Sequence, residues 1–217
     1  MAAGLYLSTD MMDSLHLPTN IAIPGDRHLS CRHLRGLIFS RVTDLLTGTV
    51  SGTEIISLPA TGMPQSYLDS LSATAISELF LMQLFLCRSL PAPVFITLPV
   101  RVLVSESLCG GLAAHDLSQT IIQIPDIEQM TVLHLRTAMQ LHKNLYGLKC
   151  AGARIYVKDV NPGQIKILSG LSLPLSGIKI NRLTFQSACR SVSTLPVLVS
   201  RLHDLTPDII VEGVDSQ

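Results

Sequence analysis

Charged side chains lie beside apolar, strand-like runs at three places in this chain. Glu54 belongs to one such run, the pair Lys158-Asp159 follows a second, and Glu212 ends a third. Carboxylate oxygens are the ligands that hard divalent cations prefer, so these acids could belong to a metal site. Lys158 argues against that chemistry, because a cation at about 4 Å from an ammonium is repelled by about 4 kcal/mol per unit charge in an effective dielectric near 20.

Three blocks of sequence surround these charged groups. Gly36 to Leu58 contains two apolar runs around a Thr47-Gly48 turn. Gly152 to Asn181 reads as an apolar strand, the charged pair, a Pro-Gly loop, a short helix and a second strand. The third block is the apolar run that leads into the tetrad Glu212 to Asp215.

Together these blocks resemble the EAL family of cyclic di-GMP phosphodiesterases, in order and in spacing, over roughly Gly36 to Gln217. The glutamate of the family's E-A-L triplet corresponds to Glu54, its D-D-F-G segment to the stretch from Lys158 to Asn161, and its E-G-V-E tetrad to the block that begins at Glu212. The resemblance implies a TIM-barrel-like fold. For an intact member it implies phosphodiester hydrolysis with two divalent ions.

Carried over position by position, the family's site pattern falls on nine residues of this chain: Glu54, Thr97, Gln123, Lys158, Asp159, Lys179, Asn181, Glu212 and Asp215. Four of them depart from the pattern, with threonine for asparagine, glutamine for glutamate, lysine for aspartate and asparagine for aspartate. The nine positions carry a formal charge of −2, whereas the intact pattern carries −6. We therefore predict a vestigial site with no catalytic residue, no metal and no cofactor.

Lys158 also suggests what stands in place of the ions. We expect its ammonium to form a salt bridge with Glu54 or Glu212, which would keep the remaining acids from repelling one another. The alternative is that Lys158 extends its ammonium into solvent at the mouth of the barrel.

The periodicity of the chain independently predicts the α/β class. Expected strands alternate with expected helices, an order that favours a parallel sheet and, as one closed form of it, a barrel. The strands are expected at 37–43, 50–58, 94–98, 120–125, 153–158, 177–180 and 208–212, and the helices at 65–89, 101–108, 128–146, 163–169 and 185–203. We expect an N-terminal extension over 1–35 and one degenerate EAL-like barrel domain over 36–217.

Composition excludes several classes of protein. The most apolar stretch, Ala75 to Leu90, is interrupted by polar residues and is too short to span a membrane. No export signal opens the chain, so we expect a cytoplasmic protein. A net charge of zero, 4% aromatic residues and no tryptophan argue against direct nucleic-acid binding. The scattered cysteines and histidines favour reduced core thiols and ordinary side chains over a metal site.

The expected barrel is incomplete at its C-terminus. The chain stops after the E-G-V-E match, where an intact member would continue with another strand and a closing helix. Two strand edges, Asp208 to Glu212 and its neighbour across the gap, would then lack a partner, and such edges invite pairing. The N-terminal segment, through its apolar run Asn20 to Pro24, a second copy of the chain, or a different protein could cover the gap.

The damaged site predicts a non-enzymatic EAL-like regulator that acts by binding another protein. Degenerate relatives that bind transcription regulators are the precedent for the class of partner. The alternative is a receptor that binds cyclic di-GMP without hydrolysing it. It is less favoured because Leu58 stands where the family has an arginine, so a buried phosphate would lose a hydrogen bond worth about 1.5–3 kcal/mol.

Overall fold

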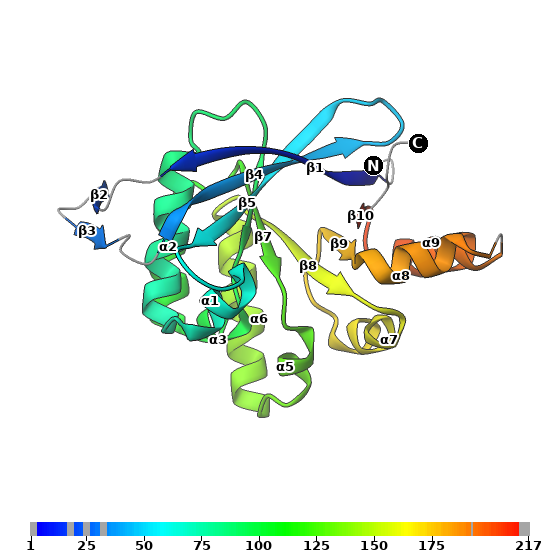
Figure 1. The fold of residues 1–217 in the computed structure, drawn as a ribbon. Helices are drawn as coiled ribbons and strands as arrows, with labels where there is room; N and C mark the ends of the chain where they lie inside the picture. Colours follow the sequence, from blue (N-terminus) through cyan, green and yellow to red (C-terminus); the bar gives the residue numbers. More distant parts are fainter. Residues whose placement is uncertain (1–3, 17–19, 24–26, 31–33, 192, 213–217) are drawn as a thin grey trace.

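The computed structural model describes residues 4–16, 20–23, 27–30, 34–191 and 193–212. Within this part of the chain, the main sheet is a closed barrel with the strand order β1-β10-β9-β8-β7-β6-β5-β4 (Figure 1). Its strands are β1 (Gly4–His16), β4 (Leu34–Asp44), β5 (Val50–Pro59), β6 (Val94–Thr97), β7 (Thr120–Ile124), β8 (Arg154–Val160), β9 (Gly177–Ile180) and β10 (Asp208–Glu212). The predicted α/β, TIM-barrel-like fold is confirmed, and each of the seven expected strands is present.

Strand β4 runs against both of its neighbours, whereas β5 to β10 are mutually parallel. The expectation of two unpaired strand edges is wrong, because β1 pairs in parallel with β10 and antiparallel with β4. Gly4 lies opposite Asp208 at one edge, and His16 lies opposite Gly36 at the other. The segment expected to be an N-terminal extension therefore supplies the strand that closes the barrel.

The apolar run proposed to fill the gap lies elsewhere. Within it, Asn20–Ile23 forms β2, which pairs with β3 (Arg27–Ser30) in a separate two-stranded sheet. This small sheet projects from the barrel on the side away from β10 (Figure 1). Pro24, the end of the expected run, lies outside the described residues.

Four of the five expected helices are each divided into two. The helices are α1 (Pro64–Ser70), α2 (Ala73–Leu86), α3 (Val100–Leu103), α4 (Glu106–Ala113), α5 (Ile127–Thr131), α6 (Leu135–Cys150), α7 (Pro162–Leu171), α8 (Arg182–Cys189) and α9 (Thr194–His203). At two breaks a serine caps the second helix, because the hydroxyls of Ser72 and Ser105 accept hydrogen bonds from the backbone N–H of Ala75 and Leu108. A short polar side chain thus starts a new helix inside each apolar run.

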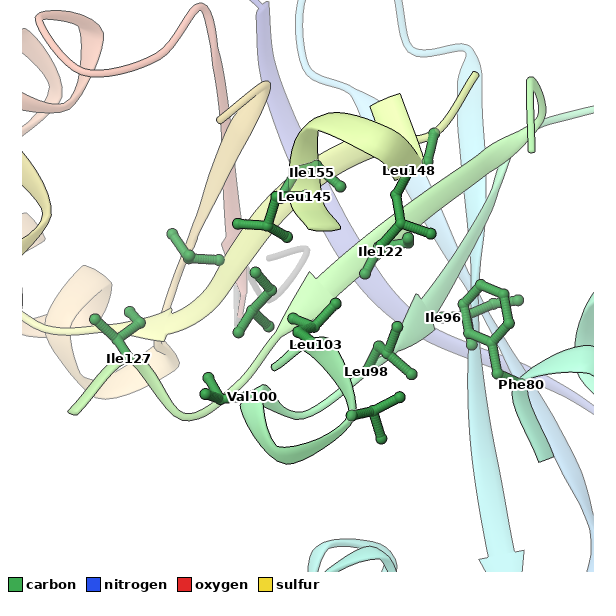
Figure 2. Packing of buried hydrophobic residues seen from close by; sticks show 14 of the residues in the cluster. Phe80, Ile96, Leu98, Val100, Leu103, Ile122, Ile127, Leu145, Leu148 and Ile155 are labelled. Carbon is green, nitrogen blue, oxygen red and sulfur yellow. The ribbon is translucent and has the colours of Figure 1, made fainter. Parts of the chain in front are cut away.

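The main core lies between the outer face of the barrel and the helices that cover it. Figure 2 shows part of it, with Ile96 and Ile122 on neighbouring strands facing Phe80 of α2 and Leu148 of α6. Each of these side chains is at most 1% exposed. Burial of this kind is worth about 1.5–3 kcal/mol for each large apolar side chain.

A second, smaller cluster fills the barrel itself. It consists of Val42, Phe95, Ile121, Tyr156 and Ile210, from five different strands. The rings of Phe95 and Tyr156 meet edge to face with centroids 5.6 Å apart. The barrel is therefore plugged by side chains at this level, as in other barrels of its size.

The cysteines only partly follow the expectation of core thiols. Cys87 and Cys109 are buried, and burial raises the pKa of each thiol to about 12. Cys150 and Cys189 are exposed, and Cys31 lies outside the described residues.

Two glycines make room for the aromatic plug. A Cβ atom on Gly177 would lie 2.1 Å from the ring of Tyr156, and one on Gly52 would lie 2.4 Å from the ring of Phe95. We expect Gly177→Ala to lower the free energy of unfolding by about 1–3 kcal/mol, because the rigid ring has no free space into which to move. Urea denaturation measures the change. The control is Gly170→Ala, which meets no atom within 4 Å and should not destabilise. Equal losses for the two variants would contradict this account.

Candidate functional site

The five side chains inside the barrel, from Val42 to Ile210, form an apolar plug. Beyond this plug, toward the carboxyl ends of the parallel strands, the inward-facing residues are polar. Because side chains alternate along a strand, the residues two positions from the plug also face inward. The polar layer contains Ser40, Glu54, Thr97, Gln123, Lys158, Lys179 and Glu212. This is the end of the barrel at which TIM-barrel enzymes carry their active sites.

Lys179 lies at the centre of this layer. Its Nζ is 2.6 Å from Oε2 of Glu54 and 2.5 Å from Oε1 of Glu212. The lysine side chain is 2% exposed and that of Glu54 is 5% exposed, whereas that of Glu212 is 31% exposed. One buried ammonium therefore connects β9 with its neighbour β10 and with β5.

Lys158 reaches the same carboxylate from another strand. Its Nζ is 3.9 Å from Oε1 of Glu54, and its side chain is 18% exposed. The predicted internal salt bridge with Glu54 is thus confirmed, although at the long end of the range, while Glu212 is paired with Lys179 instead. Glu54 consequently faces two ammonium groups.

A β-bulge interrupts β8 between Val157 and Val160. Val157 pairs with Ile178 and Val160 with Ile180, so β8 carries one extra residue relative to β9. Lys158 faces the interior by ordinary alternation from Tyr156, and the extra residue lets Val160 pack in the outer core instead of facing inward. Asp159 takes a left-handed backbone conformation with φ of 60°, and its half-exposed carboxylate lies 3.9 Å from Lys158.

The charges of this cluster stabilise one another. Burial alone would raise the pKa of the Glu54 carboxyl, but Lys179 and Lys158 outweigh it and hold that pKa below its ordinary value. Burial would likewise lower the pKa of Lys179, but Glu54 and Glu212 outweigh it and hold the pKa above its ordinary value. Glu54 and Lys179 are therefore both charged at neutral pH. Together with Glu212 they form a group of three that we call the ion triad.

The remaining predicted positions are more dispersed. Gln123 is fully buried, and its side-chain amide is near enough to Glu54 to help lower the pKa of that carboxyl. Thr97 lines a cavity of about 50 Å³ together with Lys158. Asn181 is the N-cap of α8, and its side chain accepts a hydrogen bond of 2.8 Å from the backbone N–H of Thr184. Asp215 lies outside the described residues.

Two features of the site were not foreseen from the sequence. Lys179 had been matched to the family pattern without a structural role, although a lone lysine in an apolar strand is itself a sign of a buried partner. Asp126 follows β7, and its carboxylate accepts hydrogen bonds of 3.0 and 3.3 Å from the backbone N–H of Val100, the first residue of α3. Burial raises the pKa of Asp126, partly offset by that N–H. Asp126 therefore ties two loops of the barrel mouth together.

Within the described ranges, no three side chains of His, Cys, Asp or Glu are grouped as ligands of a metal ion would be. The same part of the chain has no helix with the length and apolar content needed to cross a membrane.

No family model and no curated protein sequence matches this chain. Solved structures do. An EAL domain protein from Listeria monocytogenes aligns with a TM-score of 0.63 at 18% identity, covering 83% of this chain and 78% of that one. The EAL domain of FimX from Pseudomonas aeruginosa, bound to c-di-GMP, aligns with a TM-score of 0.65 at 19% identity, over 83% and 80% of the two chains.

A third match, Klebsiella pneumoniae BlrP1 in a complex with manganese and cyclic di-GMP, has a TM-score of 0.67 at 17% identity. It covers 97% of this chain, which spans 54% of BlrP1. At these identities the likeness shows the fold alone: the chain has the fold of EAL domains.

The ion triad generates a prediction about stability. Replacement of Lys179 by methionine leaves Glu54 buried with only the distant Lys158, so we expect a loss of about 3–5 kcal/mol in the free energy of unfolding at neutral pH. In the variant, burial raises the pKa of Glu54. The deficit should therefore shrink as the pH falls through that raised pKa and Glu54 becomes neutral. Urea denaturation between about pH 4 and 8 measures both effects.

Lys143 provides a matched control. Its Nζ lies 2.6 Å from Glu106, the same separation as in the buried pair, but both side chains are about two-thirds exposed. Lys143→Met should cost at most about 1 kcal/mol. Similar losses for the two lysine variants would show that the triad is not a determinant of stability.

In the unsubstituted protein, the lowered pKa of Glu54 stabilises the fold at pH values above 4.5, the ordinary pKa of a glutamate. This contribution is lost as the pH falls through the folded-state pKa.

Proposed function

We propose that this chain is a non-enzymatic regulatory protein with an EAL-type barrel that acts by binding another protein. The observation that carries the proposal is the Lys158 ammonium, 3.9 Å from Glu54, at a position where the family pattern has an aspartate. Lys179 belongs to the family pattern, so its ion pairs alone do not argue against a metal. Lys158 does, because it adds a second positive charge to the same carboxylate.

The donors that remain do not fit a pair of divalent ions. Such ions need several carboxylate or carbonyl oxygens that are free to coordinate. Glu54 is already paired with two ammonium groups, and Glu212 is paired with one of them. A divalent ion about 4 Å from Lys158 would meet a repulsion near 8 kcal/mol in an effective dielectric of about 20, twice the value for unit charges.

The neutral substitutions weaken the pattern further. Gln123 supplies an amide where the pattern has a glutamate, and Asn181 uses its side-chain oxygen to cap α8. The cavity beside Lys158 measures about 50 Å³, whereas small-molecule sites typically measure about 300–1,000 Å³. This cavity could hold ordered water but not a dinucleotide.

Two general features support protein binding. The mean hydropathy is +0.41 and only 15% of residues are charged. This composition is apolar for a chain whose whole surface faces water. Several large apolar side chains are more than half exposed on the helices, among them Leu135, Met139, Leu183 and Val197. The idea that an open strand edge provides the binding surface is set aside, because β1 pairs with both edges.

A c-di-GMP receptor is the alternative function. It is favoured by the fold, since the matching FimX structure is a c-di-GMP complex. The alternative requires that nucleotide binding survive although Leu58 replaces the family's arginine.

We expect calorimetry of the chain with cyclic di-GMP to show no binding, with or without manganese, and a phosphodiesterase assay to show no product. The charge at position 158 opposes the metal ions that hydrolysis needs, and Leu58 in place of the family's arginine removes a hydrogen bond to the nucleotide's phosphate. The comparison protein is the fourfold variant Thr97→Asn, Gln123→Glu, Lys158→Asp, Asn181→Asp, which returns the family's oxygen ligands and should bind manganese more tightly than the original chain. Measurable hydrolysis by the original chain, or a Kd near 1 µM, equivalent to about 8 kcal/mol, would contradict the proposal.

A further inference from the structure

A groove of about 580 Å³ lies on the outside of the barrel between α7, α8 and α9. These helices gather at the side of the molecule opposite the β2–β3 sheet (Figure 1), and α9 contacts both of the others. Apolar side chains form much of the groove, including Ile165, Leu183, Ala188, Val197 and Leu198. The groove is separate from the ion triad, since none of its lining residues belongs to the polar layer.

The apolar surface of this groove is left open in the isolated chain. Leu183 is 74% exposed and Val197 is 52% exposed, while Ala188 and Leu198 form a buried floor. Small residues, Thr184 and Ser187 among others, allow close approach of a partner backbone. Leu135 and Met139 on α6 are equally exposed but line none of the described cavities, so they offer a partner no comparable recess.

The three helices that line the groove carry no acidic residue. The whole chain carries 16 basic and 16 acidic residues, yet no Asp or Glu occurs between Asp159 and Asp204. The same stretch contains Lys166, Lys179, Arg182, Arg190 and Arg201. All of these except Lys179 are exposed, and Arg201 lines the groove itself. The groove is thus an apolar recess between helices whose charged side chains are basic.

This charge decides between possible occupants. A two-fold dimer would place the same surface of two copies against each other, so basic helices would face basic helices. An acidic partner would meet complementary charge, which favours both its encounter and its orientation. α9 has ten residues and is about 15 Å long at 1.5 Å per residue, enough to flank about three turns of a partner helix.

We propose that the groove formed by α7, α8 and α9 binds an acidic amphipathic helix of a partner protein. Apolar side chains of that helix, spaced at i, i+3 or i+4 and i+7, would enter between Leu183 and Val197. Its carboxylates would pair with the exposed basic residues of the three helices. The inference rests on the proposed function and specifies where and with what chemistry the partner binds.

The test uses the full chain and three fluorescent helical peptides of about five turns. The first has a leucine stripe flanked by glutamates, the second has the same stripe flanked by lysines, and the third has the composition of the first in scrambled order. Fluorescence anisotropy should give the first peptide at least a tenfold lower Kd than either of the others, and its affinity should fall as salt is added. Equal binding of all three, or no binding of the first, would overturn the proposal.

Surface variants locate the binding site. Leu183→Asp and Val197→Asp should each weaken binding of the acidic peptide at least tenfold, and Arg201→Glu should weaken it and reduce its salt dependence. Leu135→Asp is the matched control, since Leu135 is 77% exposed on α6, and it should bind as the original chain does. Circular dichroism and thermal unfolding confirm that each variant is folded. A control variant that loses binding to the same extent would refute the location.

Sedimentation equilibrium addresses the competing occupant. A dimer that dissociates on Leu183→Asp substitution would show that a second copy, not an acidic helix, fills the groove. The nucleotide titrations are repeated on the groove variants. A chain that binds the acidic peptide and also hydrolyses cyclic di-GMP would contradict the non-enzymatic function while retaining the groove, so the two failures are distinguishable.

Discussion

The carboxyl end of this barrel depends on the ammonium of Lys179, held between the carboxylates of Glu54 and Glu212. Glu54 is buried, and a buried carboxylate without a partner is costly enough to unfold or reorganise its surroundings. The ammonium removes that cost and at the same time links β5 to β9 and β10. Lys158 adds to the neutralisation of Glu54 from β8, where it faces inward two residues after Tyr156. The buried charges of the polar layer are therefore paired with one another and do not need water as a partner.

The barrel is closed by the strand nearest the N-terminus, which lies between the last strand, β10, and β4. Because β4 is antiparallel to β5 while β10 is parallel to β9, any strand between β10 and β4 must be parallel to one and antiparallel to the other. β1 meets this requirement from the N-terminal side of the sequence. It occupies the place that the family resemblance assigns to a strand beyond the E-G-V-E tetrad. Both edges are thereby paired, which removes the exposed edges that promote aggregation.

The sequence predicted the barrel strands from β4 onward well, because each is a short apolar run bounded by turn residues. It did not predict β1, whose alternation is interrupted by the Asp10-Met11-Met12-Asp13 stretch, where the register with β4 also shifts. It joined helices that Ser72 and Ser105 separate, since a single serine hardly changes an apolar pattern. Lys158 was placed beside Glu54 correctly. The central position of Lys179 depends on contacts between β5 and β9, which no local pattern encodes.

In the proposed function, the barrel mouth holds no pair of metal ions and the partner binds on the outer helices. The ion triad is held by groups deep in the barrel, so changes on the outer helices need not disturb it. In the same chain, the stretch from Val160 to His203 carries only basic charge, and its helices surround an apolar recess. A surface helix gains nothing in its own stability from an exposed Leu183, and like charges on neighbouring helices reduce that stability. Both features cost the isolated chain free energy, and the proposed acidic partner would offset that cost by covering them. For this reason we place the function of the molecule on the outer helices and its structural constraint inside the barrel.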